Sequence, residues 1–345
     1  MNGLFDQTLN KIFSEVKSDE PMSLHTTAKV GGKARRFVDA HQTEQIPHAV
    51  TCCRRFQVPF FVLGNGSNVI FSDKGFDGLV IRNLSQNYRI LASSKVSQSK
   101  SDIPVRYQPL PSSDTLPKSD KQERIKLNTV LVEVDSGLRL TALMKNLLKQ
   151  GITGLEWFAG IPASVGGAIY MNLHGGERFF SHLVAEATLL SGEQVKVVPN
   201  AYFKFNYDYS VLHDTREIVL RAILRLQKSD VSEAERFSRQ WAKHKSMQPQ
   251  KSAGCIFRNL TEEEQIRLNL PTSSTGYVID KILQLKGTRC GDAVISTQHA
   301  AFIENLGKAK AADFYTLTQL IKNQAKQKLN LDLKLEVEFV GEFQN

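Results

Sequence analysis

Cys255 stands among small residues in the stretch KSAGCIFRNL, residues 251–260, with no second cysteine nearby. A thiol is mostly protonated at neutral pH and far more acidic than a hydroxyl, so a positioned cysteine can take part in proton transfer. A small thiol in a strand is also ordinary core packing. The stretch alone leaves both interpretations open.

Three glycine-containing loops suggest a second kind of chemistry: HTTAKVGGKA, LGNGSNVIF and GIPASVGGAIYMN, residues 25–34, 63–71 and 160–172. Glycines let backbone N–H groups turn toward a ligand with no Cβ in the way, so such loops can cradle a pyrophosphate. A plain turn explains any one of them equally well, and neither a Rossmann fingerprint nor a Walker loop is present. Together they favour a long ligand with several polar joints, which describes a dinucleotide.

The elements that must position these loops alternate between strand and helix. Apolar residues at helical spacing predict an amphipathic helix within residues 1–21. Residues 36–82 show a βαβ pattern, which implies a largely buried sheet. The third glycine loop ends in a strand-like run. Further strands are predicted over TVLVEVDSG, ATLLSG, QVKVVP and EIVLRAILRLQ, with a helix over LTALMKNLLKQ that ends at Gly151.

A polar tract at residues 93–126 is rich in Ser, Lys and Pro and has no sustained period, which predicts a loosely ordered insertion. A polar helix over residues 231–245 is expected to lead into a second domain. That domain begins helix-rich near YVIDKILQLKG and continues with strands over AVIST and AAFIEN, a helix over DFYTLTQLIKNQAKQKL and a final strand LKLEVEFVG.

Composition excludes several classes of protein. With 345 residues, 41% hydrophobic and 23% charged, the chain is typical of a soluble globular protein of two or three domains. Its beginning is too charged for a secretory signal, and no apolar run is long enough to span a membrane, so we expect the cytoplasm. The four cysteines are too irregularly spaced for a disulfide framework or a zinc site, and no metal is expected. The net charge of +9 is scattered, so no nucleic-acid partner is expected; it suits small anionic ligands.

The order of the motifs resembles a known family. T-T-x-x-x-G-G-x-A is followed by L-G-N-G-S-N, G-I-P-x-S-V-G-G-A, S-A-G-C-I-F-R-N, I-D-K-x-x-x-L-K-G and, near the end, L-x-x-E-V. This series resembles UDP-N-acetylenolpyruvoylglucosamine reductase, a flavoenzyme family of peptidoglycan precursor synthesis. The resemblance covers roughly residues 22–341, apart from the insertion.

The resemblance implies an α+β fold: after the N-terminal helix at 1–21, a two-subdomain FAD-binding fold of the vanillyl-alcohol oxidase type over 22–226 and a C-terminal α/β substrate-binding domain over 227–345. In that family NADPH reduces FAD, and hydride then passes to the enolpyruvyl double bond of a UDP-sugar, giving UDP-N-acetylmuramate. We therefore expect a monomer that takes FAD as cofactor, NADPH as co-substrate and a small UDP-sugar as substrate.

The resemblance also assigns site residues. Cys255 occupies the position of the serine that protonates the substrate in most members, and Glu336 matches the glutamate that stabilises or protonates the intermediate. Asn259, Tyr207 and Arg258 are expected at the substrate, with Lys243 or Lys245 as the cation near its phosphates. The FAD residues are expected in the three loops: Thr27, Gly31, Gly32, Gly64, Asn65, Gly66, Ser67, Asn68, Ile161, Pro162, Ser164, Gly166 and Gly167.

Three departures from the family pattern leave two functions open. Asp208 and Glu338 stand where the family has arginines, and the loop holding His174 is two residues short. If residues two apart in the final strand share a face, Glu336 gains a like-charged neighbour. Either the enzyme is active with another cation, such as Arg258, Lys204 or His174, on the substrate carboxylate, or the chain is an impaired flavin-binding or redox-sensing module. An oxidase of the wider flavin family fits the C-terminal motifs less well.

Overall fold

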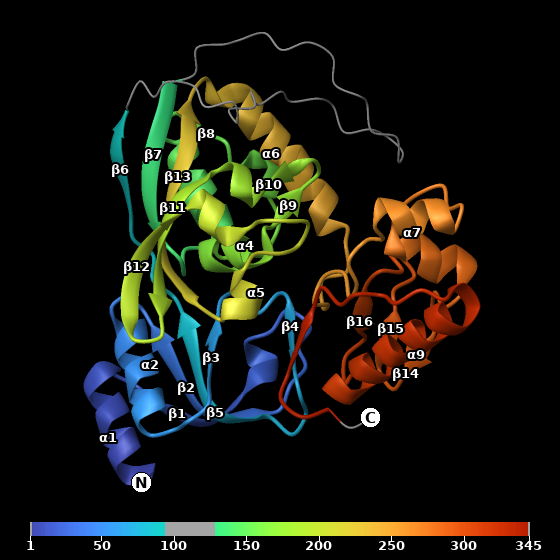
Figure 1. Ribbon diagram of the computed structural model, residues 1–345, viewed down its shortest axis with the longest axis horizontal. Coiled ribbons are helices and arrows are strands. Elements are labelled where there is room, and N and C mark those ends of the chain that lie inside the picture. Colours follow the sequence, from blue (N-terminus) through green and yellow to red (C-terminus); the bar gives the residue numbers. More distant parts are fainter. Residues whose placement is uncertain (1, 94–127, 344–345) are drawn as a thin grey trace. The chain divides into compact units, whose positions relative to one another are not determined.

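The computed structural model describes residues 2–93 and 128–343, so the predicted insertion lies, beyond residue 93, outside the described residues. Helices and sheets are mixed throughout, which confirms the α+β class (Figure 1). Contacts divide the chain into two compact units. Unit 1 comprises Met1–Leu84 together with Ser246–Asn345, and unit 2 comprises Ser85–Lys245.

The N-terminal part of unit 1 is a sheet in the order β1-β2-β5-β3. Strands β2 (Lys33–Ala40), β5 (Phe76–Asn83) and β3 (Phe60–Leu63) run parallel, and β1 (Lys17–Pro21) pairs antiparallel with β2. The parallel part confirms the predicted βαβ pattern, with α2 (Gln45–Arg55) as its helix. Cys52 and Cys53 are buried on α2, as expected of packing residues.

The predicted N-terminal helix is shorter than expected. Helix α1 covers Asn2–Ile12 and buries Phe5 and Leu9, but residues 17–21 belong to strand β1. The helical spacing of apolar residues ends near Val16, and Pro21 lacks the N–H that a continuing helix would need. The rest of the predicted helix is therefore an edge strand.

The other part of unit 1 has its own core, to which the N-terminal half contributes. Ala28, Val30 and Ile70 pack in one cluster with Phe257 and Phe314. Helix α9 lies against β14 and β15 (Figure 1). The elements are β4 (Val69–Phe71), α7 (Glu262–Arg267), α8 (Thr275–Tyr277), β14 (Arg289–Cys290), β15 (Ala293–Ile295), β16 (Ile303–Asn305), α9 (Ala311–Leu329) and β17 (Glu338–Val340), with short helical turns η1 (Met22–Leu24) and η5 (Val278–Ile282).

The predicted final strand is interrupted. Only β17 is a strand, paired in parallel with β4, whereas Leu335 forms an isolated bridge with Phe257. A bend at Val337 separates the two pairings. The alternation expected between Glu336 and Glu338 therefore does not apply, because the two residues do not share one continuous strand.

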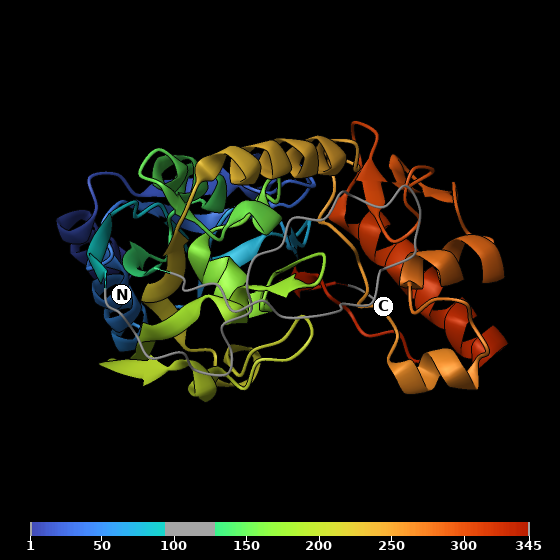
Figure 2. The same ribbon diagram turned by 90° about the horizontal axis from the view of Figure 1, so that it is seen from above.

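Unit 2 is built on an antiparallel sheet in the order β12-β11-β13-β7-β6, with β8 added to β13. Figure 2 shows α6 as one unbroken helix, and it buries Phe237 and Trp241. The elements are β6 (Tyr88–Ser93), β7 (Asn128–Asp135), α3 (Leu140–Leu148), β8 (Ile152–Thr153), η2 (Glu156–Phe158), α4 (Val165–Met171), β9 (His174–Gly175), β10 (Arg178–Phe179), η3 (Phe180–His182), β11 (Val184–Ser191), β12 (Gln194–Pro199), η4 (Asn200–Phe203), α5 (Leu212–Thr215), β13 (Ile218–Lys228) and α6 (Val231–Ser246).

The strand-like end predicted for the third glycine loop is wrong, because residues 165–171 form helix α4. Ser164 is the residue that starts it: its Oγ accepts a hydrogen bond from the backbone N–H of Gly167 at 3.3 Å. A short apolar run reads the same as a strand or as a buried helix, so periodicity could not distinguish them.

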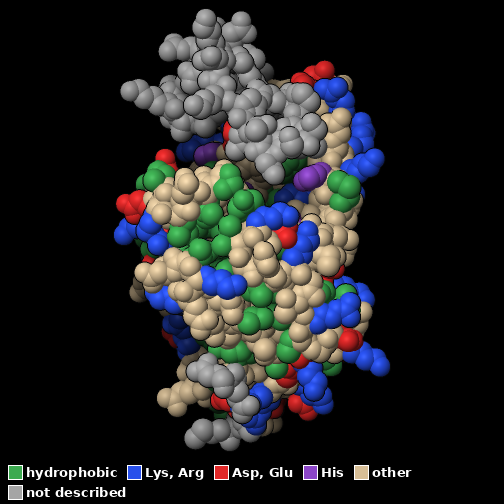
Figure 3. All heavy atoms as spheres, turned by 90° about the vertical axis from the view of Figure 1, so that its right-hand side faces the viewer, with side chains coloured by type: hydrophobic (Ala, Val, Ile, Leu, Met, Phe, Trp, Pro, Cys, Tyr) green, Lys and Arg blue, Asp and Glu red, His purple; other side chains and the backbone are tan. Residues whose placement is uncertain are grey.

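The structure also shows how charged side chains are distributed on one face, and whether a helix could span a membrane. On the face shown in Figure 3, Lys and Arg side chains are scattered among uncharged and acidic groups and form no single patch. No helix in the described part of the chain is both long enough and apolar enough to cross a bilayer.

Candidate functional site

Cys255 and Glu336 lie on neighbouring extended segments of unit 1. The backbone N–H of Glu336 donates to the carbonyl oxygen of Ile256 at 2.9 Å, directly beside Cys255. Cys255 itself forms an isolated bridge with Phe302, and its side chain is partly exposed. The fold thus brings together two residues that are 81 positions apart by their numbers, and it leaves the thiol accessible.

The second glycine loop is tied to the same place. Asn68 Nδ2 donates to the carbonyl oxygen of Glu336 at 2.9 Å, and the backbone N–H of Glu338 donates to the carbonyl oxygen of Asn68 at 3.0 Å. This loop follows β3 directly, so it lies at the carboxyl end of a parallel strand. Ligands of open parallel sheets bind at that edge.

The first glycine loop is tied to the Cys255 stretch. Thr27 Oγ1 donates to the carbonyl oxygen of Ser252 at 2.6 Å, and the backbone N–H of Thr27 donates to that of Gly66 at 2.9 Å. Asn305 Nδ2 adds a bond to the carbonyl oxygen of Ala28 at 3.0 Å. Two of the three predicted FAD loops and both predicted catalytic residues therefore belong to one connected backbone network.

The glycines of these loops and of the Cys255 stretch differ in what a side chain would meet at their positions. A Cβ on Gly32 would lie 2.2 Å from the carbonyl oxygen of Asp73, and one on Gly66 would lie 2.0 Å from that of His25. Those two glycines are required by the protein's own backbone. Gly254 has no atom within 4 Å of such a Cβ, and Gly167 has only Ser164 Oγ at 3.4 Å, so the main chain there is open to a ligand.

The donor groups in the three loops fit a dinucleotide. The predicted FAD residues provide hydroxyls, side-chain amides and backbone N–H groups, and no carboxylate is among them. Such a set can hydrogen-bond a pyrophosphate without repelling it. The open main chain at Gly167 adds room for close approach.

Arg258 and Asn259 follow Cys255 in sequence and differ in their surroundings. Asn259 Oδ1 accepts from the backbone N–H of Thr275 at 3.2 Å, which fixes its amide. Arg258 Nε is buried without a hydrogen-bond partner among the described residues. A buried guanidinium nitrogen in that state favours a bound anion as its partner.

The third glycine loop belongs to unit 2. The backbone N–H of Gly166 donates to the carbonyl oxygen of Ser136 at 2.8 Å, and a Cβ on Gly166 would lie 3.2 Å from that oxygen. Ile161, Pro162 and Ser164 precede α4. The loop is therefore held against the turn that follows β7.

Tyr207 and Asp208 pack at the other end of α4. Asn172, which ends the helix with a φ of 47°, donates to the carbonyl oxygen of Asn206 at 2.8 Å. Asp208 has a φ of 46° and is buried. Its Oδ1 lies 3.6 Å from Nε2 of His174, and the Tyr207 ring lies 5.2 Å from the His174 ring.

The surroundings of His174 disfavour its charged form. Burial lowers the pKa of His174, and the nearby Lys245 ammonium lowers it further, against a backbone hydrogen bond with Gly176 that raises it. This argues against His174 as a substitute for the arginine expected at this turn.

The two candidate phosphate-binding lysines differ in their packing. Lys245 is partly buried, with Nζ 5.4 Å from the centre of the Trp241 ring, and its charge reaches His174. Lys243 is exposed on the same helix. The structure favours Lys245 as the residue nearer to the Tyr207 turn.

The predicted site residues thus fall into two sets. Unit 1 holds Cys255, Glu336, Arg258, Asn259 and two FAD loops, and unit 2 holds Tyr207, Lys245, Lys243 and the third loop. In the described residues, no group of three or more His, Cys, Asp and Glu could hold a metal ion. His25 was not predicted as a site residue, although it directly precedes the Thr26-Thr27 pair of the first glycine loop.

Comparison with known proteins decides the family. A family model described as UDP-N-acetylenolpyruvoylglucosamine reductase, C-terminal domain, matches residues 247–340, and an FAD binding domain model matches residues 118–197. The UDP-N-acetylenolpyruvoylglucosamine reductase of Pseudothermotoga lettingae is 30% identical over 335 residues, which covers 96% of this chain and 99% of that protein. The chain belongs to the UDP-N-acetylenolpyruvoylglucosamine reductase family.

Other members of the reductase family agree in length and fold. The Geobacillus kaustophilus reductase is 31% identical over 95% of this chain and 93% of its own. The crystal structure of the Thermus caldophilus reductase superposes with a TM-score of 0.67 at 28% identity, over 95% of this chain and 98% of that one. The recognised family and fold class are therefore confirmed.

Proposed function

We propose that this chain reduces UDP-N-acetylglucosamine enolpyruvate to UDP-N-acetylmuramate through bound FAD, with NADPH as the reductant, in peptidoglycan precursor synthesis. Membership of the reductase family supports the reaction. The observation that carries it is the backbone contact that holds Glu336 beside Cys255, joined through Asn68 to a predicted FAD loop. The division into an FAD-binding part over 22–226 and a substrate-binding part over 227–345 remains a prediction, as do a monomeric state and a cytoplasmic location.

Within unit 1, the FAD would be held by the first two glycine loops, with hydroxyl and amide donors from Thr27, Asn65 and Ser67. The third loop, with Ser164, remains a predicted FAD contact. The chemistry supplied by bound FAD is hydride transfer from NADPH to the substrate carbon beta to the carboxylate. All remaining steps belong to side chains of the chain itself.

Cys255 supplies the proton in this proposal. As hydride arrives at the beta carbon, the electron pair of the double bond moves toward the alpha carbon and the carboxylate. The S–H bond of Cys255 breaks and its proton forms the new C–H bond at the alpha carbon; solvent then reprotonates the thiolate. Glu336, held next to Cys255, would help to stabilise the intermediate.

Arg258 is the cation that would face the substrate carboxylate. Its Nε is buried and has no hydrogen-bond partner in the described part of the chain, whereas burial and the Lys245 ammonium lower the pKa of His174. Asn259 would add a neutral hydrogen bond. Tyr207 as a substrate contact, and Lys245, with Lys243 as the alternative, as the cation for the nucleotide phosphates, remain predictions from the family resemblance.

An anaerobic spectroscopic titration tests the proposal. The purified chain should show a flavin spectrum that bleaches on addition of NADPH and returns on addition of the UDP-enolpyruvyl sugar, with one equivalent of UDP-N-acetylmuramate formed. Bleaching without recovery would favour an impaired flavin-binding module instead. A chain that binds no FAD at all would contradict both functions.

A further inference from the structure

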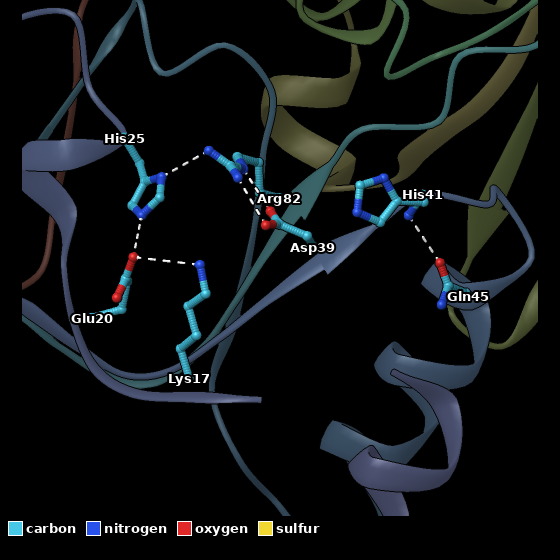
Figure 4. Close-up of polar contacts among 7 residues, drawn as sticks. All are labelled: Lys17, Glu20, His25, Asp39, His41, Gln45 and Arg82. Atoms are coloured by element: carbon cyan, nitrogen blue, oxygen red, sulfur yellow. Dashed lines mark hydrogen bonds and ion pairs between the residues drawn. The ribbon is translucent and has the colours of Figure 1, made fainter. Parts of the chain in front are cut away.

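His25 lies between two charged side chains in unit 1 (Figure 4). Its Nε2 is 2.7 Å from Glu20 Oε1, and its Nδ1 is 2.9 Å from Arg82 Nη1. An arginine can only donate, so Nδ1 must accept, and the proton is then on Nε2, which donates to Glu20. The two partners thus select the tautomer with its proton on Nε2.

The ring is also fixed on its faces. It stacks on Phe37 with 4.2 Å between the ring centres and an angle of 22° between the planes. Arg82 is itself held by two hydrogen bonds to Asp39, at 2.6 and 2.8 Å, and Lys17 Nζ lies 3.9 Å from Glu20 Oε1. The His25 side chain is only 7% exposed. The imidazole therefore has one orientation and one hydrogen-bonding pattern.

Two members of this cluster stand at the edge of the sheet from which the second glycine loop emerges. Asp39 and Arg82 are paired in register near the carboxyl ends of β2 and β5, and Leu63, the last residue of β3, pairs with Arg82. The loop Gly64-Asn65-Gly66 begins at the next residue. Asp39, Arg82 and this loop therefore share one edge.

The backbone of His25 joins the cluster to both loops. Its carbonyl oxygen occupies the space beside Gly66, where a Cβ would be only 2.0 Å away. Two residues later, Thr27 donates its N–H to the carbonyl oxygen of Gly66 and its hydroxyl to that of Ser252. A shift of His25 would therefore displace the first loop and press on the second.

We propose that His25 is a positioning residue for FAD binding: its ring, held between Glu20 and Arg82, sets the main-chain conformation of the loops at Thr27 and Gly66. The assignment rests on the proposed function, because it needs those loops to hold FAD. It adds a residue outside the glycine motifs to the set on which cofactor binding depends.

FAD titration of the flavin-stripped full chain, followed by flavin fluorescence, tests the role. His25→Ala removes hydrogen bonds to two charged partners, and FAD affinity should fall about ten- to a hundredfold. His25→Asn keeps an acceptor near the Nδ1 position for Arg82, and His25→Gln keeps a donor near the Nε2 position for Glu20. Each should restore part of the affinity, which a purely space-filling role would not predict.

His41→Ala is the matched control, because His41 is exposed at the end of the same sheet and only its backbone N–H contacts Gln45 (Figure 4). Equal FAD affinity in His25→Ala and the unsubstituted chain, or an equal loss in His41→Ala, would overturn the role of His25. If His25→Ala does not fold, the Asn and Gln variants decide by the same criterion. Absence of FAD binding by the unsubstituted chain would overturn the proposed function itself.

Discussion

Asn68 Nδ2 donates a hydrogen bond to the main-chain oxygen of Glu336 across 2.9 Å, and it does so from a loop that we assign to FAD. One amide thereby supports both the cofactor loop and the segment beside Cys255. The pairing is fixed from both sides, since Glu338 donates its N–H to the carbonyl oxygen of Asn68.

Asn68→Ala should therefore affect two quantities together. Loss of the side-chain bond releases the segment at Glu336, and we expect kcat to fall about tenfold and FAD affinity to fall with it. Asn10→Ala, an exposed position on α1, is the control. A variant with weakened FAD binding but unchanged kcat at saturating FAD would contradict the shared role.

Cys255 can be tested by its two nearest replacements. Cys255→Ala should abolish steady-state turnover while FAD stays bound and reducible by NADPH, because only the proton donor is lost. Cys255→Ser should retain turnover, since serine is the usual acid in the family that the chain resembles. Cys290→Ala, at another partly exposed thiol, should leave kcat unchanged. Normal turnover by Cys255→Ala would contradict its assignment.

The role of Arg258 at the substrate carboxylate can be tested by the KM for the UDP-enolpyruvyl sugar. Arg258→Met removes the only guanidinium that we assign to the substrate carboxylate, and KM for the UDP-enolpyruvyl sugar should rise about ten- to a hundredfold while KM for NADPH changes little. Arg267→Met, on the exposed face of α7, should leave both values unchanged. An unaltered KM for the sugar in Arg258→Met would move carboxylate recognition to another residue.

Glu217 predicts how stability depends on pH. Burial alone would raise the pKa of Glu217, but hydrogen bonds from Lys196, Ser191, Tyr202 and Thr215 outweigh it and lower the pKa from 4.5 to about 2. A carboxylate of lowered pKa stabilises the fold above pH 4.5, and this contribution is lost as the pH falls toward 2. Converted directly into a free energy of unfolding, this pKa shift corresponds to about 3 kcal/mol. Because solvent screens the partly exposed Lys196, we expect a contribution of about 1–2 kcal/mol.

Urea unfolding of Glu217→Gln measures that contribution. The variant should be less stable than the unsubstituted chain at neutral pH, and the difference should shrink steadily below pH 4.5. Glu193→Gln, in the exposed turn before β12, should show little difference at any pH. A gap that stays constant down to about pH 3 would mean that Glu217 acts through packing instead.

The sequence predicted an element correctly where its hydrophobic periodicity and the residues that end a helix or strand indicated the same boundaries. Alternating and helical patterns located β2, α2, β7, β13 and α9, and the order of motifs identified the family. The prediction failed where the pairing of a segment with distant residues determines its structure. The closing stretch has the pattern of one strand, but Leu335 pairs with Phe257 and Glu338 pairs with Val69. No local signal reports which distant segments supply those partners.

The candidate site shows the same limit. Cys255 and Glu336 were found by motif, but no sequence signal predicts the backbone bond from Glu336 to Ile256 that places Glu336 next to Cys255. The cluster around His25 was missed because Glu20, Asp39 and Arg82 come from three separate strands, and each looks like an ordinary charged residue in its own stretch. Gly66 was predicted as a glycine that lets a ligand approach the backbone, but the structure shows that the carbonyl oxygen of His25 leaves no room for a side chain there.

The pairing of β17 with β4 has a consequence for how the molecule is made. Unit 2 is continuous in sequence, so all its strands have been synthesised before residue 246 is added. Strand β4 cannot acquire its neighbour until residue 340 has been synthesised. Until then the first half of unit 1 has an open strand edge at β4, and Ile70 lacks the C-terminal core residues that bury it in the finished fold.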